Sequence, residues 1–237
     1  MADLVTRLGR VVGVEVTGLR ESGAMAGGLE RAATRTRVGT VIDVGASDGR
    51  WSVMARRFFP QANFLLLEAQ AAPHEGALRN LAQRHPKFSY VLAAAGDRRG
   101  SIHFDASDPF GGAASTQSLG DASVVVRMTS VDEEVRRLQL PGPYVLKLDT
   151  HGFEREILAG ARRTLASTEI LVIESYNFEL RPGVMRFHEL CAHVETLGFR
   201  VIDLVDVMRR PSDRIFWQCD LFFARATREE FSSSTFD

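Results

Sequence analysis

The chain has 237 residues, of which 45% are hydrophobic and 25% are charged, as is typical of a globular domain. Its 29 basic and 30 acidic side chains nearly cancel, so the charge gives no indication of a nucleic-acid partner. Cys191 and Cys219 match no metal or redox spacing, and a cytoplasmic location is expected. Residues 1–16 lack the apolar core of a signal peptide, and no apolar run reaches the ~20 residues of a membrane span.

Apolar runs alternate with segments of helical periodicity from residue 38 onward. Predicted strands lie at 38–45, 62–70, 87–96, 101–107, 123–132, 143–152, 169–176, 200–208 and 216–225. Predicted helices lie at 47–59, 72–85, 153–165 and 183–198. This alternation predicts an α/β domain with a mostly parallel sheet over residues 38–225. Residues 1–37 are expected to form a helical or irregular N-terminal cap, and residues 226–237 a flexible tail.

A glycine loop follows the first predicted strand, within VIDVGASDGRWS at 41–52. Its letters GASDG fit the G-x-S-x-G pattern of a hydrolase nucleophile, but Ser47 follows the first strand and no oxyanion loop precedes it. The position instead suits a cofactor loop between a strand and a helix. Gly45 permits a sharp turn and a close approach to a ligand, Gly49 relieves crowding, and Ser47 or Asp48 is the expected N-cap.

The loop lacks the third glycine of a dinucleotide fingerprint, and Asp48 would repel a pyrophosphate. An acid there tolerates a cation such as the sulfonium of S-adenosylmethionine. Glu68 ends the second strand, where a carboxylate can accept the ribose hydroxyls, and the small segment 93–97 can pass along an adenine edge. Asp43 orders the loop or binds the ligand's ammonium. The predicted cofactor-binding residues are Asp43, Gly45, Ala46, Ser47, Asp48, Gly49, Glu68, Ala69, Ala95, Gly96 and Asp97.

An ordered set of motifs resembles the FkbM family of methyltransferases across residues 38–225. The motifs are VIDVGASDGRWS, LLLEAQ, AAAGDRRGSIHF, MTSVDEEV, YVLKLDTHGFEREILAGA, LVIES and CDLFFAR. The resemblance implies a Rossmann-like class I methyltransferase fold, with a mostly parallel sheet and helices on both faces. It also implies S-adenosylmethionine as methyl donor and transfer to oxygen, commonly on sugars, glycolipids or natural-product scaffolds.

The reacting end of the site is predicted at two neighbouring strand ends. Lys147, Asp149 and His151 alternate along one strand, and Glu174 ends the next. With an ordinary pKa near ~6.5, His151 suits a general base, and Asp149 holds the substrate hydroxyl or orients the imidazole. Lys147 is also expected to pair with Asp149 or Glu174.

A metal is the alternative at this end, because Asp149, Glu174 and Asn177 offer oxygen ligands of the kind that Mg²⁺ takes. The long loop 107–121 is a candidate lid, with Ser115, Thr116 and Gln117 toward an acceptor.

Two other functions remain open from the sequence. One is a catalytically silent module that binds S-adenosylmethionine, and the other is a nicotinamide-dependent oxidoreductase. The expected partner is a small-molecule or glycan acceptor rather than a nucleic acid, and a homo-oligomer stays open.

Overall fold

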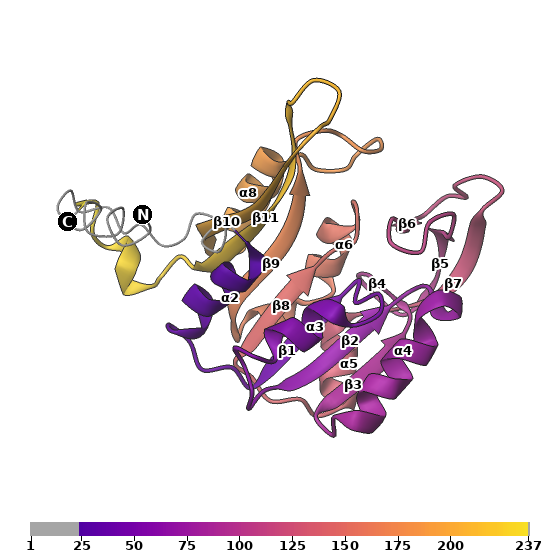
Figure 1. Cartoon of the computed structure of the whole chain (residues 1–237), viewed down its shortest axis with the longest axis horizontal. Coiled ribbons are helices and arrows are strands. Elements are labelled where there is room, and N and C mark those ends of the chain that lie inside the picture. Colours follow the sequence, from indigo (N-terminus) through magenta and orange to yellow (C-terminus); the bar gives the residue numbers. More distant parts are fainter. Residues whose placement is uncertain (1–23, 237) are drawn as a thin grey trace, which may run out of the picture.

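A seven-stranded sheet in the order β10-β11-β9-β8-β1-β2-β3 forms the centre of the computed structural model, which describes residues 24–236 (Figure 1). The parallel strands are β1 (Thr40–Val44), β2 (Asn63–Glu68), β3 (Phe88–Leu92), β8 (Tyr144–Leu148) and β9 (Thr168–Tyr176). β11 (Phe216–Arg225) lies antiparallel between β9 and β10 (Phe199–Arg209). The predicted mostly parallel sheet is confirmed.

The chain enters this sheet in the middle. β1 has β2 on one side and β8 on the other, so the connections leave it in opposite directions. In such sheets, ligands bind outside the carboxyl ends of the strands at the point where the order reverses. The fold therefore places the ligand crevice beyond Val44 and Leu148, where β1 and β8 end.

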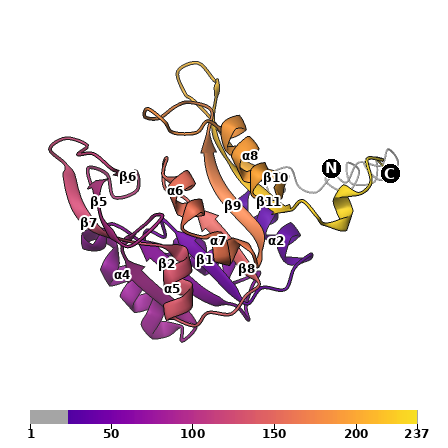
Figure 2. The same ribbon diagram turned by 180° about the vertical axis from the view of Figure 1, so that it is seen from behind.

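Helices cover both faces of the sheet, as Figures 1 and 2 show from opposite sides. One apolar cluster contains Val41 and joins α2 (Met25–Ala33), α3 (Arg50–Ala55) and α4 (Ala71–Arg84) to the sheet. The other contains Ile42 and joins α5 (Val131–Arg137), α6 (Glu154–Ala159), α7 (Arg162–Leu165) and α8 (Phe187–Thr196). Burial on both faces explains why the strands read as continuous apolar runs rather than alternating ones.

A second sheet was not predicted. Its order is β4 (Ala94–Ala95), β7 (Ser123–Thr129), β5 (Gly100–Asp105) and β6 (Ala113–Ser115). The strand expected at 87–96 divides at Ala93, after which β4 pairs with β7 instead of continuing beside β2. In Figure 1, β5, β6 and β7 lie on one side of α6 and the β10–β11 hairpin lies on the other.

Three predictions of element boundaries need correction. The strand expected over 123–132 ends at Thr129, because Ser130 Oγ accepts a hydrogen bond from the backbone N–H of Glu133 and starts α5. The helix expected over 153–165 is broken into α6 and α7. At the break, Gly160 leaves no room for a Cβ beside the carbonyl oxygen of Gly96. The N-cap of α3 is Gly49, with φ of 83°, rather than Ser47 or Asp48.

The structure describes part of the expected N-terminal cap and most of the expected tail. Residues 1–23 of the predicted cap lie outside the described residues, and α2 of the remainder packs on the sheet. In the tail, Glu229–Phe231 form a 3-10 helix, and the Arg200 guanidinium lies 4.3 Å from the centre of the Phe231 ring. The division into cap, domain and tail stays a prediction. Within residues 24–236, no helix has the length and apolar character to cross a bilayer.

Candidate active site

A cavity of about 570 Å³ opens at the carboxyl ends of β1, β2, β8 and β9, a volume in the range of small-molecule sites. All four predicted reacting residues line it, together with six of the predicted cofactor residues. These ten are Gly45, Ala46, Ser47, Glu68, Ala69, Ala95, Lys147, Asp149, His151 and Glu174. The structure thus brings the two predicted halves of the site to one cavity.

Five predicted cofactor residues do not line the cavity: Asp43, Asp48, Gly49, Gly96 and Asp97. The Asp48 carboxylate pairs with the Arg50 guanidinium at 2.7 Å, and Asp97 pairs with Arg98 at 3.0 Å. The Asp48–Arg50 pair also weakens the expectation that Asp48 repels a pyrophosphate, because Arg50 neutralises the carboxylate.

The glycine loop is shaped by backbone packing. Gly45 has φ of 76°, and a Cβ there would overlap the carbonyl oxygen of Asp149. The expected close approach at Gly45 is therefore made to the end of β8. At Gly49, a Cβ would overlap Leu81 of α4, so this glycine relieves crowding as expected.

Lys147 joins the loop strand to the reacting end through two ion pairs. Its Nζ lies 2.9 Å from Asp149 Oδ2 and 3.3 Å from Asp43 Oδ1, and all but 5% of its side chain is buried. Burial lowers the pKa of Lys147, but the two carboxylates outweigh it and raise the pKa overall. The expected pairing with Asp149 is confirmed. Asp43 also accepts a hydrogen bond from Ser52 Oγ at 2.7 Å, which anchors α3 to β1.

Glu68 ties the glycine loop to the end of β2. Its two carboxylate oxygens accept hydrogen bonds from the backbone N–H groups of Ser47 and Gln70, each at 2.7 Å. Burial raises the pKa of Glu68 despite these donors. Each oxygen keeps a further lone pair, so the carboxylate can still accept hydroxyl groups from the cavity.

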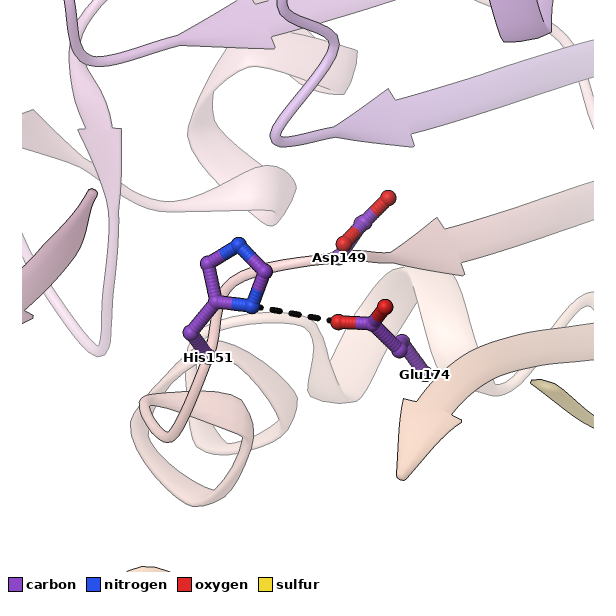
Figure 3. Close-up of side chains that lie close together, drawn as sticks. All are labelled: Asp149, His151 and Glu174. Atoms are coloured by element: carbon purple, nitrogen blue, oxygen red, sulfur yellow. Dashed lines mark ion pairs between the residues drawn. The ribbon is translucent and has the colours of Figure 1, made fainter. Parts of the chain in front are cut away.

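Asp149 and His151, which follow β8, converge with Glu174 of β9 (Figure 3). His151 Nδ1 lies 3.1 Å from Glu174 Oε2 and 2.8 Å from Tyr176 Oη. Tyr176 Oη donates its only proton to Glu174 Oε2 at 2.5 Å, so it can accept only from a protonated Nδ1. His151 Nε2 lies 3.1 Å from the carbonyl oxygen of Phe110, which also requires an N–H. The geometry therefore describes an imidazolium.

The pKa of His151 agrees with this arrangement. Burial lowers it, but the hydrogen bond and charge of Glu174 dominate and raise it from 6.5 to about 9. The expected titration near neutrality is wrong for this environment, because the partners of His151 stabilise its charged form. A histidine that is charged at pH 7 must first lose a proton before it can act as a base.

A metal fits this cluster poorly, although one atom of each of the three side chains lies within 4.8 Å of the others. Glu174 already accepts from Tyr176 and from Gln218 Nε2 at 2.5 Å, and Asp149 faces the Lys147 ammonium. Two cations, Lys147 and the His151 imidazolium, thus already neutralise the carboxylates that a metal ion would need as ligands. The expectation of Mg²⁺ finds no support.

Two buried polar atoms on the cavity wall have no hydrogen-bond partner among the described residues. They are Ser47 Oγ and Trp51 Nε1, and the ring of Trp51 lies 5.3 Å from Lys147 Nζ. A buried donor without a partner is costly, so these atoms suit polar groups of a bound molecule. Ala93, Ala94 and Ala95 give the cavity a small, apolar stretch of wall.

Further cavity residues escaped the sequence analysis. They include Met25, Arg50, Trp51, Met54, Phe104, Pro109, Phe110, Phe153, Ile157, Asp206 and Asp220. Asp220 stands out because burial, Glu174 and Asp149 raise its pKa to about 7. A detectable signal existed, since Asp220 interrupts the apolar run of β11 as Asp43 interrupts β1.

The long loop 107–121 reaches the cavity through different residues than expected. Pro109 and Phe110 line the main cavity, whereas Ser115 and Thr116 line a separate, smaller one and Gln117 lines neither. The carbonyl oxygens of Asp108 and Pro109 lie 2.8 Å from Gln70 Nε2 and His74 Nε2. With the Phe110–His151 contact, these bonds hold the segment 108–110 across the cavity.

The sequence profile of the methyltransferase FkbM domain matches residues 43–201. The chain belongs to the FkbM methyltransferase family. This match spans most of the chain from the glycine loop to the start of β10, and it confirms the resemblance and its Rossmann-like fold. S-Adenosylmethionine-dependent methyl transfer is the general chemistry of this family. No curated protein matches the chain.

Solved structures with similar folds include other methyltransferases. The FkbM methyltransferase from Methylobacillus flagellatus is 15% identical, with a TM-score of 0.49 over 77% of this chain and 43% of its own. The present chain thus spans less than half the length of that structure. An O-methyltransferase family protein from Burkholderia thailandensis is 14% identical, with a TM-score of 0.45 over 96% of this chain and 59% of its own. The precorrin-6y C5,15-methyltransferase from Geobacter metallireducens is 16% identical, with a TM-score of 0.46 over 84% of this chain and 86% of its own. At these identities the likeness concerns the fold alone.

Proposed function

We propose that this protein is an S-adenosylmethionine-dependent O-methyltransferase. Its acceptor is a hydroxyl group of a sugar, glycolipid or natural-product scaffold. The observation that carries the proposal is the wall of carboxylates formed by Asp149 just after β8, Glu174 of β9 and Asp220 of β11, in the same cavity as the glycine loop of a methyltransferase family. S-Adenosylmethionine supplies an electrophilic methyl group on a sulfonium, and the wall supplies groups that bind the acceptor and take its proton.

The charge of the cavity favours a cationic donor over a dinucleotide. Its carboxylates outnumber its cationic side chains, which are Arg50, Lys147 and His151. The carboxylates are Glu68, Asp149, Glu174, Asp206 and Asp220. Such a cavity attracts a sulfonium and repels a pyrophosphate. The carboxylates of the cavity wall, rather than Asp48, therefore disfavour a nicotinamide cofactor.

The residues present fit the parts of S-adenosylmethionine. Glu68 accepts the ribose hydroxyls, and the small wall at Ala93–Ala95 takes the adenine. Ser47 Oγ and Trp51 Nε1, which lack partners among the described residues, suit the carboxylate of the amino-acid tail. Asp43 lies beneath the floor of the cavity, fully buried, and holds Lys147 and Ser52 in place.

The reacting end works by positioning and by proton removal. A neutral hydroxyl is a poor nucleophile, so a neighbouring base must take its proton as the new bond forms. His151, Glu174 and Tyr176 form a closed hydrogen-bonded set that keeps the wall rigid around the acceptor. Holding the hydroxyl in line with the methyl group can itself contribute ~7–11 kcal/mol.

Transfer from donor labelled with ¹³C in its methyl group, against a panel of sugars, glycolipids and polyketides, tests this function. The expected product carries the labelled methyl group on oxygen, as NMR of the product will show. Label on nitrogen or carbon would reject O-methylation. Binding of the donor without transfer to any member of the panel would favour the silent binding module. In a thermal-shift measurement, a rise in the melting temperature with NAD but not with S-adenosylmethionine would favour an oxidoreductase.

A further inference from the structure

The β11 strand brings to the cavity one carboxylate, that of Asp220, which accepts no hydrogen bond from the described part of the chain. Asp220 lies directly opposite Glu174 in the antiparallel β9–β11 pair, so the two side chains share one face of the sheet. Both line the cavity. We infer that Asp220 is the catalytic base, which takes the proton of the acceptor hydroxyl during the proposed methyl transfer. This inference rests on the proposed function.

The other carboxylates of the cavity are already engaged by donors. Glu68 accepts from two backbone N–H groups, and Asp149 accepts from Lys147. Glu174 accepts from Tyr176 and Gln218, and Asp206 accepts from the backbone N–H of Met25 at 3.1 Å.

Asp220 differs from these four. Among residues 24–236, no donor makes a hydrogen bond to its carboxylate, and its interactions are with neighbouring charges. A carboxylate that accepts no hydrogen bond keeps the lone pairs that proton transfer needs.

The charges around Asp220 increase its affinity for a proton. Glu174 of β9, Asp149 beyond β8 and Asp206 of β10 raise the pKa of Asp220, and Lys147 of β8 lowers it. Burial has the largest effect, and the pKa is raised from 3.8 to about 7. A base is most effective when its pKa lies near the working pH, where it is both ionised and basic. His151, with its pKa at about 9, is largely protonated at pH 7.

The proposed step balances with the two substrates alone. The acceptor's O–H bond breaks and its proton moves to a carboxylate oxygen of Asp220. The acceptor oxygen uses an electron pair to bond the methyl carbon, and the carbon–sulfur bond breaks with its pair left on sulfur. The products are a methyl ether, a neutral thioether and protonated Asp220. Water then takes the proton and restores the carboxylate.

The test compares Asp220→Asn with wild type and with Asp121→Asn, a control at an exposed loop position. Asp220→Asn is expected to bind the donor within about two-fold of wild type by calorimetry and to lose ~10²–10⁴-fold in turnover. Wild-type turnover should rise with pH through a midpoint at or below about 7. A carboxyl ¹³C resonance that is present in wild type and missing from Asp220→Asn should titrate near the same pH without any substrate. If Asp220→Asn does not fold, Asp220→Ser gives the same readouts.

Two results would overturn the assignment of Asp220. One is turnover within ten-fold of wild type in the folded variant, and the other is a wild-type midpoint near 9, which identifies His151 as the base. Failure of the proposed function would look different. Wild-type protein would then transfer no methyl group to any hydroxyl, and the inference would fall with the function.

Discussion

Replacing Asp220 by asparagine should stabilise the protein at alkaline pH, although the same change should abolish its turnover. In the folded protein, burial and then Glu174 and Asp149 raise the pKa of Asp220 from 3.8 to about 7. The folded state therefore binds this proton more tightly than the unfolded state does. Ionisation of Asp220 therefore lowers the free energy of unfolding as the pH rises above about 4, and the loss is complete above about 7.

The size of the effect follows from the two pKa values. At roughly 1.4 kcal/mol for each pKa unit, a rise from 3.8 to about 7 costs the folded state about 4 kcal/mol at pH 8. At pH 5 Asp220 lowers the free energy of unfolding by only about 1.5 kcal/mol relative to its value at low pH, because its carboxyl group is still protonated in the folded state. Asparagine carries no charge at either pH. Asp220→Asn should therefore gain up to about 2.5 kcal/mol more over wild type at pH 8 than at pH 5.

Urea unfolding at the two pH values measures this difference. For a chain of this size, each kcal/mol should also move the melting temperature by roughly 2–4 °C. The control Asp121→Asn, at an exposed position, should stay within about 0.5 kcal/mol of wild type at both pH values. An equal effect of Asp220→Asn at pH 5 and at pH 8 would refute the reasoning, because it would show that Asp220 does not hold a proton at pH 5.

Three further predictions concern the rest of the site. Glu68→Ala should weaken donor binding by ~1.5–3 kcal/mol in calorimetry, the scale of a charged hydrogen bond. The control Glu75→Ala, at a partly exposed position outside the cavity, should not weaken it, and equal affinity in both variants would remove Glu68 from the donor site. The raised pKa of His151 stabilises the fold fully below about 6.5, and this stabilisation is lost as the pH rises through about 9. The advantage of wild type over His151→Ala should thus shrink by about 3 kcal/mol between pH 6 and pH 10 in urea unfolding, and a constant difference would contradict the imidazolium. Treatment with a chelator should leave turnover unchanged, whereas a loss that Mg²⁺ restores would revive the metal mechanism.

The part of the site that is formed by consecutive parallel strands could be predicted from the sequence. Asp149 directly follows β8, and Glu174 lies near the end of β9, the next parallel strand, so their convergence follows from the order of elements along the chain. Asp220 lies on β11, which inserts between β9 and β10, and its place beside Glu174 depends on a pairing between distant parts of the chain. A single sequence does not specify such a pairing.

The charge state of His151 was equally out of reach. It depends on Phe110, Glu174 and Tyr176, which lie 23 to 41 residues away along the chain and meet only in the folded protein. The start of α5 was within reach, by contrast, because Ser130 followed by Glu133 is a local N-cap signal. The break between α6 and α7 was not, since its surroundings include Gly96, which lies 64 residues before Gly160 in the chain and comes close to it only in the folded protein.

A crystal structure with the demethylated donor, S-adenosylhomocysteine, bound would test the central claim most directly. The account predicts that its ribose hydroxyls contact Glu68 and that its adenine lies along Ala93–Ala95. Its sulfur should face the wall formed by Asp149, Glu174 and Asp220. A ligand bound outside this cavity, or bound with its sulfur turned away from these carboxylates, would contradict the account.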